Sequence, residues 1–406
     1  MDYYAKYSEL RRDIDSHRWG YNDTLILITM ISTFFVWGVV LSIAPLITTW
    51  PFIPKYFDVY IIFSSPAGLL LGNFFLGYIS DKSGRKKLFL FTVILTSFGL
   101  IGISLLKNPY LMIFFIFISE FGLGGDETIS LAYLSELLPL KYRGVVLIET
   151  SNVANISIVI MAAIFLFIPS SVYIDKFSLF TIAILGFIIS FITRLKLSES
   201  IRWDYLKKHN IKEKIKINFK KIINFISLSF IAITIVVGFA FSSLVLGPYE
   251  FPKYSSLIIF GSTIGGTITG IIGGFYMGKS RRKIVSLIGY TGMFIVWLIV
   301  LIFLKFILSN ILYLIIMISI SGIFGEFGWA SREMLEPENF ETSYRGMGIG
   351  GVRMVGYSVY IISVFLLANK TIYFYLYYLL IIYLIGFLGS IIYYIYGRET
   401  KDMSVI

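Results

Sequence analysis

The chain has 406 residues, of which 57% are hydrophobic and 15% are charged, and its formal net charge is +11. Soluble proteins carry roughly 25% charged residues, so this chain has too little polar surface to face water on all sides. It contains no cysteine, which excludes disulfides and thiolate metal sites. We expect no metal and no other cofactor.

Apolar runs long enough to cross a bilayer follow a polar start at residues 1–20. These runs predict twelve membrane helices, at residues 22–48, 59–79, 88–106, 110–137, 145–168, 177–195, 223–246, 255–277, 284–304, 311–333, 346–368 and 372–396. The one long polar stretch between them is basic, which fits either a helix along the lipid surface or a solvated linker. The predicted organisation is an N-terminal six-helix bundle at 1–195, a cytoplasmic basic linker at 196–222 and a C-terminal six-helix bundle at 223–406.

Basic residues are distributed unevenly between the two sides of this arrangement. With both termini on one side, 28 of the 35 Lys and Arg fall on that side and six in the opposite loops, which leaves Arg353 within a helix. The positive-inside rule makes the terminal side cytoplasmic. The positive charge therefore sets orientation, and we expect no nucleic-acid partner. We expect a multi-pass monomer in the plasma membrane, in contact with the lipid bilayer.

Four short motifs occur twice in the same order, 197 to 206 residues apart. They are the charged turn at 77–87, repeated at 274–283, and three triplets at 120–122, 142–144 and 198–200, repeated at 326–328, 344–346 and 398–400. The repetition predicts a duplicated six-helix unit, an architecture that is typical of solute carriers. No phosphate-binding loop with Lys-Ser or Lys-Thr is present, and we expect no enzymatic activity.

The charged turn at 77–87 resembles the signature loop of the major facilitator superfamily. Segments 122–144, 198–203 and 399–404 resemble parts of its sugar-porter and metabolite-symporter branches. The resemblance implies an all-α membrane fold with twelve helices in two pseudo-symmetric bundles. It also implies a close helix approach at Gly77 and an inner-face charge network that joins the halves while the cavity faces outward, formed by Asp81, Arg85, Glu136, Arg143, Glu199 and Arg202.

Asp81 ends its helix on the side where the helix dipole disfavours a negative charge. It therefore needs a positive partner, for which Arg85 and the N-terminus of another helix are candidates. The alternative is that these loop charges only fix topology.

Carboxyl groups at bilayer depth need a functional reason, because each costs about 2.5–3.5 kcal/mol to insert. Glu120 and Glu326 lie near the middle of their predicted helices, at corresponding positions of the two repeats. We expect them to face one another across a central cavity and to be candidates for proton coupling, together with Asp126 and Glu127. The alternative for Glu120 is a protonated side chain that is bonded to neighbouring backbone.

Arg353 is the one basic residue that this prediction places within a helix, and it suits an anionic group of a substrate or a nearby carboxylate. By symmetry its expected counter-charge is Glu149, and the pair alternatively clamps the halves statically. Further substrate-binding candidates lie on predicted cavity helices, and they are Trp37, Asn152, Asn155 and Tyr357.

The sequence thus predicts a secondary active transporter that moves a small polar metabolite, an organic anion or a sugar, by alternating access. Proton-coupled symport is the expected mode, with the small molecule and protons as binding partners. A facilitative sugar uniporter without ion coupling is the alternative. A membrane sensor with a transporter fold is an alternative of another class, disfavoured by the short tail after Gly397.

Overall fold

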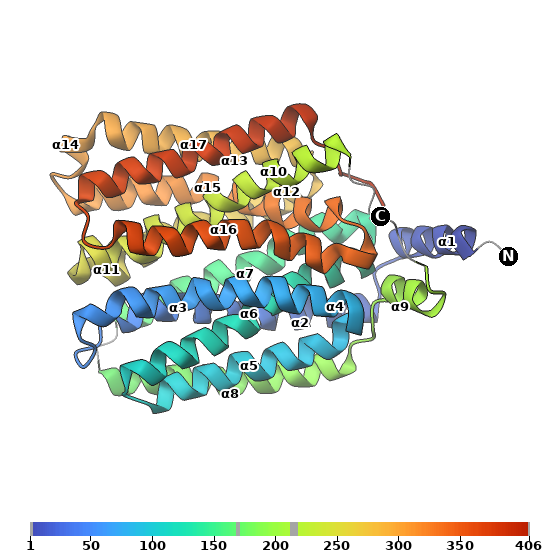
Figure 1. Ribbon diagram of the computed structural model, residues 1–406, viewed down its shortest axis with the longest axis horizontal. Coiled ribbons are helices and arrows are strands. Elements are labelled where there is room, and N and C mark those ends of the chain that lie inside the picture. Colours follow the sequence, from blue (N-terminus) through green and yellow to red (C-terminus); the bar gives the residue numbers. More distant parts are fainter. Residues whose placement is uncertain (1–2, 168–170, 212–217, 405–406) are drawn as a thin grey trace.

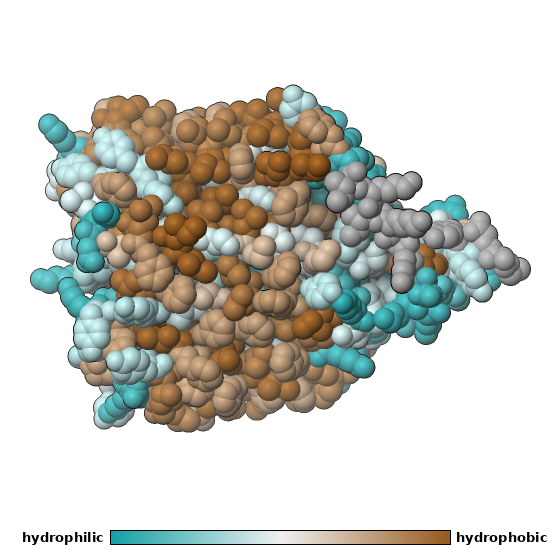
Figure 2. All heavy atoms as spheres, viewed as in Figure 1, coloured by the Kyte–Doolittle hydropathy of each residue, from teal (hydrophilic) through white to brown (hydrophobic). Residues whose placement is uncertain are grey.

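The computed structural model describes residues 3–167, 171–211 and 218–404, and within them it is built from helices. Twelve helical segments are long and apolar enough to cross a membrane, as predicted. They form two bundles that lie side by side (Figure 1). On the face that Figure 2 shows, apolar residues form a broad band across the middle, and hydrophilic ones gather at both ends. The chain has the organisation of a multi-pass membrane protein.

The N-terminal bundle consists of the first six of these segments. Its helices are α2 (Tyr21–Ile47), α3 (Asp58–Leu71) with α4 (Gly77–Ser83), α5 (Arg85–Leu105), α6 (Pro109–Leu137), α7 (Leu140–Phe167) and α8 (Val172–Lys196). A π-helical turn at Gly72–Leu76 joins α3 to α4 within one span.

The C-terminal bundle repeats this plan with one strongly modified helix. Its helices are α10 (Phe219–Ile233) with α11 (Leu246–Glu250), α12 (Ser255–Lys279), α13 (Arg282–Ile302), α15 (Ile311–Asn339), α16 (Arg345–Leu367) and α17 (Ile372–Tyr396), and the short α14 (Leu304–Ile307) precedes α15. Between α10 and α11 lie two π-helical turns, Thr234–Gly238 and Ala240–Val245. Such turns often mark functional sites, because they rotate the side chains that follow.

Matching caps show how the duplication persists in local structure. The Asn108 side chain accepts a hydrogen bond from the Tyr110 backbone N–H at 2.9 Å and begins α6. The Asn310 side chain does the same for Leu312, also at 2.9 Å, and begins α15. Asparagine is a favoured N-cap because its side-chain oxygen satisfies an otherwise unpaired amide. The two long helices that carry Glu120 and Glu326 therefore start in the same way.

Two short helices lie outside the bundles, at the end of the molecule that we call the terminal end (Figure 1). They are α1 (Tyr3–Ser16) and α9 (Ile201–Lys208). The predicted linker at 196–222 is thus only partly helical, and its residues 219–222 belong to α10. Its residues 212–217 lie outside the described part of the chain.

The two bundles meet along α7 with α12 and along α16 with α3 and α4. At the second contact, a Cβ built on Gly77 would lie 2.7 Å from the Gly346 carbonyl oxygen. A side chain at Gly77 would separate the helices, as the resemblance implied.

Several helices extend further at the terminal end than their apolar runs predicted. The helix predicted at 311–333 continues to Asn339, and the helix predicted from 145 begins at Leu140. Arg332 therefore lies well within α15, and Arg194 lies in the last turn of α8, both of which are membrane-length helices. The prediction that Arg353 is the one basic residue within a helix is therefore wrong. Arg194 and Arg332 were assigned to the cytoplasmic charges, but carboxylates neutralise them within the helices, as described below.

Candidate functional site

The terminal end of the interface between the bundles is closed by buried ion pairs that link one bundle to the other. We call this set the terminal ion-pair layer, and its members are Asp81, Arg85, Glu136, Arg143, Arg282, Glu338 and Arg345. Its arginines and glutamates are at most 3% exposed at the side chain.

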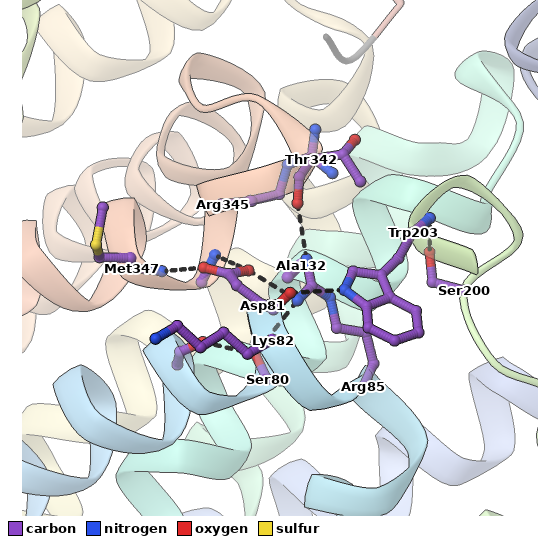
Figure 3. A network of polar contacts seen from close by, with 12 residues as sticks. Ser80, Asp81, Lys82, Arg85, Ala132, Ser200, Trp203, Thr342, Arg345 and Met347 are labelled. Atoms are coloured by element: carbon purple, nitrogen blue, oxygen red, sulfur yellow. Dashed lines mark hydrogen bonds and ion pairs between the residues drawn. The ribbon is translucent and has the colours of Figure 1, made fainter. Parts of the chain in front are cut away.

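Asp81 has both of the partners that the helix-dipole argument predicted (Figure 3). One carboxylate oxygen is 2.7 Å from Nη1 of Arg85. The carboxylate also accepts hydrogen bonds from the backbone amides of Gly346 (3.0 Å) and Met347 (2.7 Å), at the start of α16 in the other bundle. A carboxylate at a helix N-terminus is stabilised by the unsatisfied amides and the helix dipole. Asp81 therefore joins α4 to α16.

Glu136 is the acceptor at the centre of the N-terminal half of the layer. It bonds Arg85 at 2.9 Å and, across the interface, Arg345 at 2.8 Å. Ser200 donates a hydrogen bond to its other oxygen. Arg85 also reaches the other bundle directly, because its Nη2 donates to the Thr342 carbonyl at 3.0 Å.

Glu338 has the same surroundings in the C-terminal half. It pairs with Arg282 at 3.4 Å and, across the interface, with Arg143 at 3.0 Å. Thr400 donates at 2.5 Å to Oε2, the oxygen that Arg282 Nε also faces, whereas Arg143 takes Oε1. The duplication thus produces two reciprocal bridges, with the arginine of each half held by the glutamate of the other.

The other two predicted gating residues support the layer from within the N-terminal half. Glu199 accepts from the Arg85 backbone amide at 2.8 Å and so begins α5. Arg202 pairs with Asp15 of α1 at 2.7 Å and donates to the Glu136 carbonyl at 2.8 Å. Burial lowers the pKa of the Arg202 guanidinium, and the Asp15 carboxylate opposes that shift.

Two small cavities lie between the bundles, near the middle of the helices. The first, which we call the polar cavity, has a volume of about 40 Å³. Hydroxyl, amide and carboxyl side chains line it: Asn155, Thr234, Ser242, Ser243, Ser262, Thr263, Ser321, Glu326 and Tyr383. The second cavity, of about 20 Å³, shares the walls formed by Ile235, Phe239 and Trp329. Trp37, Arg332, Tyr357 and Tyr360 also line it.

The two pseudo-symmetric glutamates do not face one another. Glu326 reaches the polar cavity and accepts a hydrogen bond from Asn155 of α7 at 2.8 Å, across the interface. Glu120 instead points to α3, where Ser65 donates to it at 2.8 Å. Each carboxyl group keeps one buried oxygen without a hydrogen-bond partner in the described part of the chain. Of the two, Glu326 is the one that lines a cavity.

A second group of buried charges lies between the cavities and the terminal end, and we call it the central ion cluster. Its members are Glu127 from α6, Arg332, Glu333 and Glu336 from α15, and Arg353 from α16. Arg353 contacts all three glutamates: Glu333 at 3.1 Å, Glu336 at 2.7 Å, and Glu127 across the interface. Arg332 pairs with Glu333 at 2.8 Å and with Glu127 at 3.2 Å.

The central ion cluster corrects the predicted partner of Arg353. Arg353 is enclosed by carboxylates of α6 and α15, and Glu149 has no contact with it. Glu149 lies against Gly274 of α12 instead, half-buried. Symmetry suggested Glu149 because α7 and α16 correspond in the two repeats. Glu333 and Glu336 lie on the face of α15 that points to Arg353, so their carboxylates accept the hydrogen bonds of its guanidinium.

Asp126 is held within the N-terminal bundle. It pairs with Arg194 of α8 at 2.6 Å and accepts from Thr92 of α5 at 2.9 Å. Of the other substrate-binding candidates, Trp37 and Tyr357 line the smaller cavity and Asn155 lines the polar cavity. Asn152 donates to the Thr267 carbonyl of α12 at 3.3 Å.

Comparisons with known proteins agree with this architecture. Residues 57–222 match the family model "Sugar (and other) transporter". The solved structure of the proton:xylose symporter XylE, a member of the major facilitator superfamily, superposes with a TM-score of 0.75 at 14% identity, covering 95% of this chain and 98% of that one. The predicted fold class is confirmed: the chain has the major facilitator superfamily fold, with twelve membrane-length helices in two bundles.

Matches to curated relatives are shorter. The inner membrane metabolite transport protein YgcS of Escherichia coli is 34% identical over 84 residues, 21% of this chain and 19% of that protein. A probable inorganic phosphate transporter of Arabidopsis thaliana is 32% identical over 117 residues, 27% and 22% of the two chains. The niacin transporter NiaP of Acinetobacter baylyi is 33% identical over 85 residues, 20% and 19%. Each alignment thus covers about a fifth of the relative.

Proposed function

We propose that this protein is a secondary active transporter that carries a small polar metabolite across the plasma membrane by alternating access, coupled to protons. The carrying observation is the pair of cavities enclosed between two pseudo-symmetric bundles, beside an ion-pair layer that joins the bundles at the terminal end. We place both termini in the cytoplasm, as the basic charge of that end suggests. The layer then closes the cytoplasmic side.

The reciprocal bridges of the terminal ion-pair layer suit a gate. Buried ion pairs gain little net free energy, because the cost of removing both charges from water offsets their attraction. When the bundles separate at this end, water solvates each charge again. Arg85 and Arg282 stay in their own halves with Glu136 and Glu338. Opening therefore leaves no glutamate of the layer without a cation.

Coupling requires a carboxyl group that gains and loses a proton during the cycle. Glu326 is our leading candidate, because it lines the polar cavity and has one oxygen without a hydrogen-bond partner among the described residues. Glu127 is the second, since it crosses the interface to both central arginines. Glu120 and Asp126 are the weaker candidates, because Ser65 and Arg194, with which they interact, lie in the N-terminal bundle.

The test is transport by the purified protein in liposomes, after a thermal-shift screen of sugars, carboxylates, amino acids and phosphate has identified a substrate. We expect substrate entry to be accompanied by proton influx, measured as alkalinisation outside, and an inward proton gradient to drive accumulation. Substrate flux without proton movement would indicate the uniporter instead. Binding without flux would favour the sensor.

The proton-binding residue is identified by comparing two variants. Glu326→Gln should keep substrate exchange across the membrane but lose proton-driven accumulation, because glutamine hydrogen-bonds like a protonated glutamate and cannot release the proton. Glu9→Gln, on the exposed surface of α1, is the control for the loss of one acidic group. Unchanged accumulation in Glu326→Gln would move the proton site to another carboxyl group.

A further inference from the structure

The smaller cavity, which we now call the donor cavity, combines several buried hydrogen-bond donors that lack an acceptor. Arg332 lines it; its Nη1 has no hydrogen-bond partner in the described part of the chain, and its Nε lies 3.7 Å from a carboxylate oxygen of Glu336. The indole N–H groups of Trp37 and Trp329, which also line it, are likewise buried without an acceptor. An unsatisfied buried donor costs about 1–3 kcal/mol, and a charged one more. A cavity with this lining favours an anionic group.

The polar cavity next to it has the opposite preference. Its walls carry several hydroxyl groups, and Glu326 presents an oxygen without a partner among the described residues. On α15, Arg332 follows Glu326 by six residues, which corresponds to about 9 Å along the helix axis. Trp329, between them, is a wall of both cavities. The two cavities therefore offer donors at one end and acceptors and hydroxyls at the other.

We propose that Arg332 binds the carboxylate group of a hydroxylated monoanion, such as a six-carbon sugar acid, whose hydroxyl groups occupy the polar cavity. This inference rests on the proposed transport function and names its substrate class. Arg332 and Arg353 both pair with Glu127, Glu333 and Glu336, but of the two Arg332 is the one that lines the donor cavity, with its Nη1 lacking a hydrogen-bond partner among the described residues. The two cavities measure about 40 and 20 Å³ with the bundles closed, so the proposal requires them to widen when the bundles part.

Binding at Arg332 also affects the interface, because Arg332 holds Glu127 of the other bundle at 3.2 Å. An anion that occupies the free side of the guanidinium competes for its charge and weakens this bridge. Arg353 still holds Glu127. The substrate thus loosens one of the two ionic contacts of Glu127, which links binding to separation of the bundles.

Charge counting predicts that a proton accompanies the anion. The central ion cluster has three carboxyl groups and two guanidinium groups, so it is neutral with one bound proton. With a monoanion at Arg332 it is neutral with two. Uncompensated charge is costly at this depth, so each anion should bring one proton with it. In this count the proton binds within the cluster, where Glu127 is the second coupling candidate named above, and Glu326 lies outside it in the polar cavity. The groups that face a proton in the cluster are Glu127 from α6, Arg332, Glu333 and Glu336 from α15, Arg353 and Tyr357 from α16, and Tyr290 from α13.

The experiment measures binding to the purified full chain by calorimetry, with gluconate, glucose and inorganic phosphate as probes. Gluconate and glucose have the same carbon skeleton but differ at C1, which is a carboxylate in open-chain gluconate and the anomeric carbon of the glucose ring. Inorganic phosphate tests whether the site selects a carboxylate over another anion. We expect gluconate to bind at least tenfold more tightly than glucose, with uptake of about one proton, obtained from the dependence of the binding heat on buffer ionisation. Equal binding of the two, or anion binding without proton uptake, overturns the proposal. Phosphate binding in place of gluconate overturns the sugar-acid assignment.

Variants locate the site. Arg332→Gln should weaken gluconate binding about 10- to 100-fold, the range expected for a hydrogen bond to a charged group. Arg332→Lys should recover part of it, and Arg281→Gln, an exposed arginine of the terminal end, should bind as the parent does. If Arg332→Gln does not fold, Trp37→Phe removes one indole donor and should weaken gluconate about 2- to 10-fold. Unchanged gluconate binding in a folded Arg332→Gln or in Trp37→Phe contradicts the site. Proton-coupled uptake of a neutral sugar would overturn this inference and leave the proposed function intact.

Discussion

Asp81 and Gly278 occupy the same position in the two repeats, and they hold the bundles together in different ways. Asp81 accepts hydrogen bonds from the first amides of α16. Gly278 has no side chain, and a Cβ there would lie 2.5 Å from the Val145 backbone nitrogen, at the start of α7. The loss of the acid in the second charged turn is therefore compensated by close backbone packing. At this position, one charged turn contacts the other bundle through a carboxylate and the other through its backbone.

Replacing Asp81 by Asn should weaken the closed terminal end without preventing folding. The substitution removes the negative charge that faces Arg85 and the start of α16, and a hydrogen bond to a charged group contributes about 1.5–3 kcal/mol. We expect initial transport rates to fall by on the order of tenfold or more, while membrane insertion and yield stay unchanged. Lys82→Gln, at an exposed neighbour, is the control. Normal initial rates in Asp81→Asn would remove the gating role.

A substitution at Gly77 tests how closely the two bundles must approach one another. Gly77→Ala places a methyl group against the backbone of α16, which cannot yield as a side chain can, so we expect a lower thermal stability and loss of the closed terminal end. Gly273→Ala is the matched control, because its Cβ would meet nothing nearer than Met277 at 3.5 Å. Equal melting temperatures for the two variants would show that the contact between Gly77 and Gly346 is not required.

The sequence predicted part of the site because the repeat and the family resemblance mark it. Arg85 and Arg143 lie in repeated motifs, Glu136 lies in the segment 122–144 that carries the resemblance, and all three belong to the terminal ion-pair layer. Glu338 was missed, although it lies 202 residues after Glu136, the same interval that relates Arg143 to Arg345. Arg332 was missed because it lies at the end of its predicted helix and was counted among the cytoplasmic charges. A search for charged residues that recur at the repeat interval would find Glu338 and would miss Arg332, because Arg332 is neutralised only in the folded chain.

At the level of helices, the N-terminal bundle is fixed internally by the pair of Asp126 on α6 and Arg194 on α8. Arg194 also donates to the Phe89 carbonyl and to Thr33 of α2. These contacts connect four helices of one bundle and none of the other. We therefore interpret Asp126 as a residue that keeps the bundle rigid as it moves.

Breaking this pair should affect stability more than coupling. Asp126→Asn leaves the Arg194 guanidinium buried without its counter-charge, which typically costs about 3–5 kcal/mol of unfolding free energy. The double variant Asp126→Asn with Arg194→Gln should recover part of that loss, measured by thermal or denaturant unfolding in detergent. If Asp126→Asn instead folds normally and loses only proton-driven accumulation, Asp126 is a proton carrier.

Helix existence was predictable from hydropathy, whereas helix ends were not. Every apolar run became a membrane-length helix, because the bilayer demands about 20 residues and leaves no backbone group unsatisfied. The ends at the terminal side extend into charged sequence. There Glu336 and Glu338 remain helical because arginines of α16, α13 and the other bundle satisfy them. Such partners come from distant segments, so local patterns do not reveal them.

At the scale of the molecule, charges that join the bundles are concentrated toward one end. The central ion cluster lies between the cavities and the terminal end, and the terminal ion-pair layer lies at that end. A rocking motion that opens this end must break the bridges from Arg143 to Glu338 and from Arg345 to Glu136. We therefore expect these bridges to set the balance between the state that is closed at the terminal end and the state that is open there.

Distances between the bundles test this claim most directly, and the absence of cysteine makes the labelling specific. One spin-label pair replaces Lys82 and Arg281 at the terminal end, and another replaces Lys107 and Lys305 at the opposite end, all exposed positions. We compare the double variant Glu136→Gln with Glu338→Gln to the parent chain by electron paramagnetic resonance. The distance between the two labels at the terminal end should lengthen, and the distance between the two labels at the opposite end should shorten. Unchanged distances at both ends in the double variant would contradict the account.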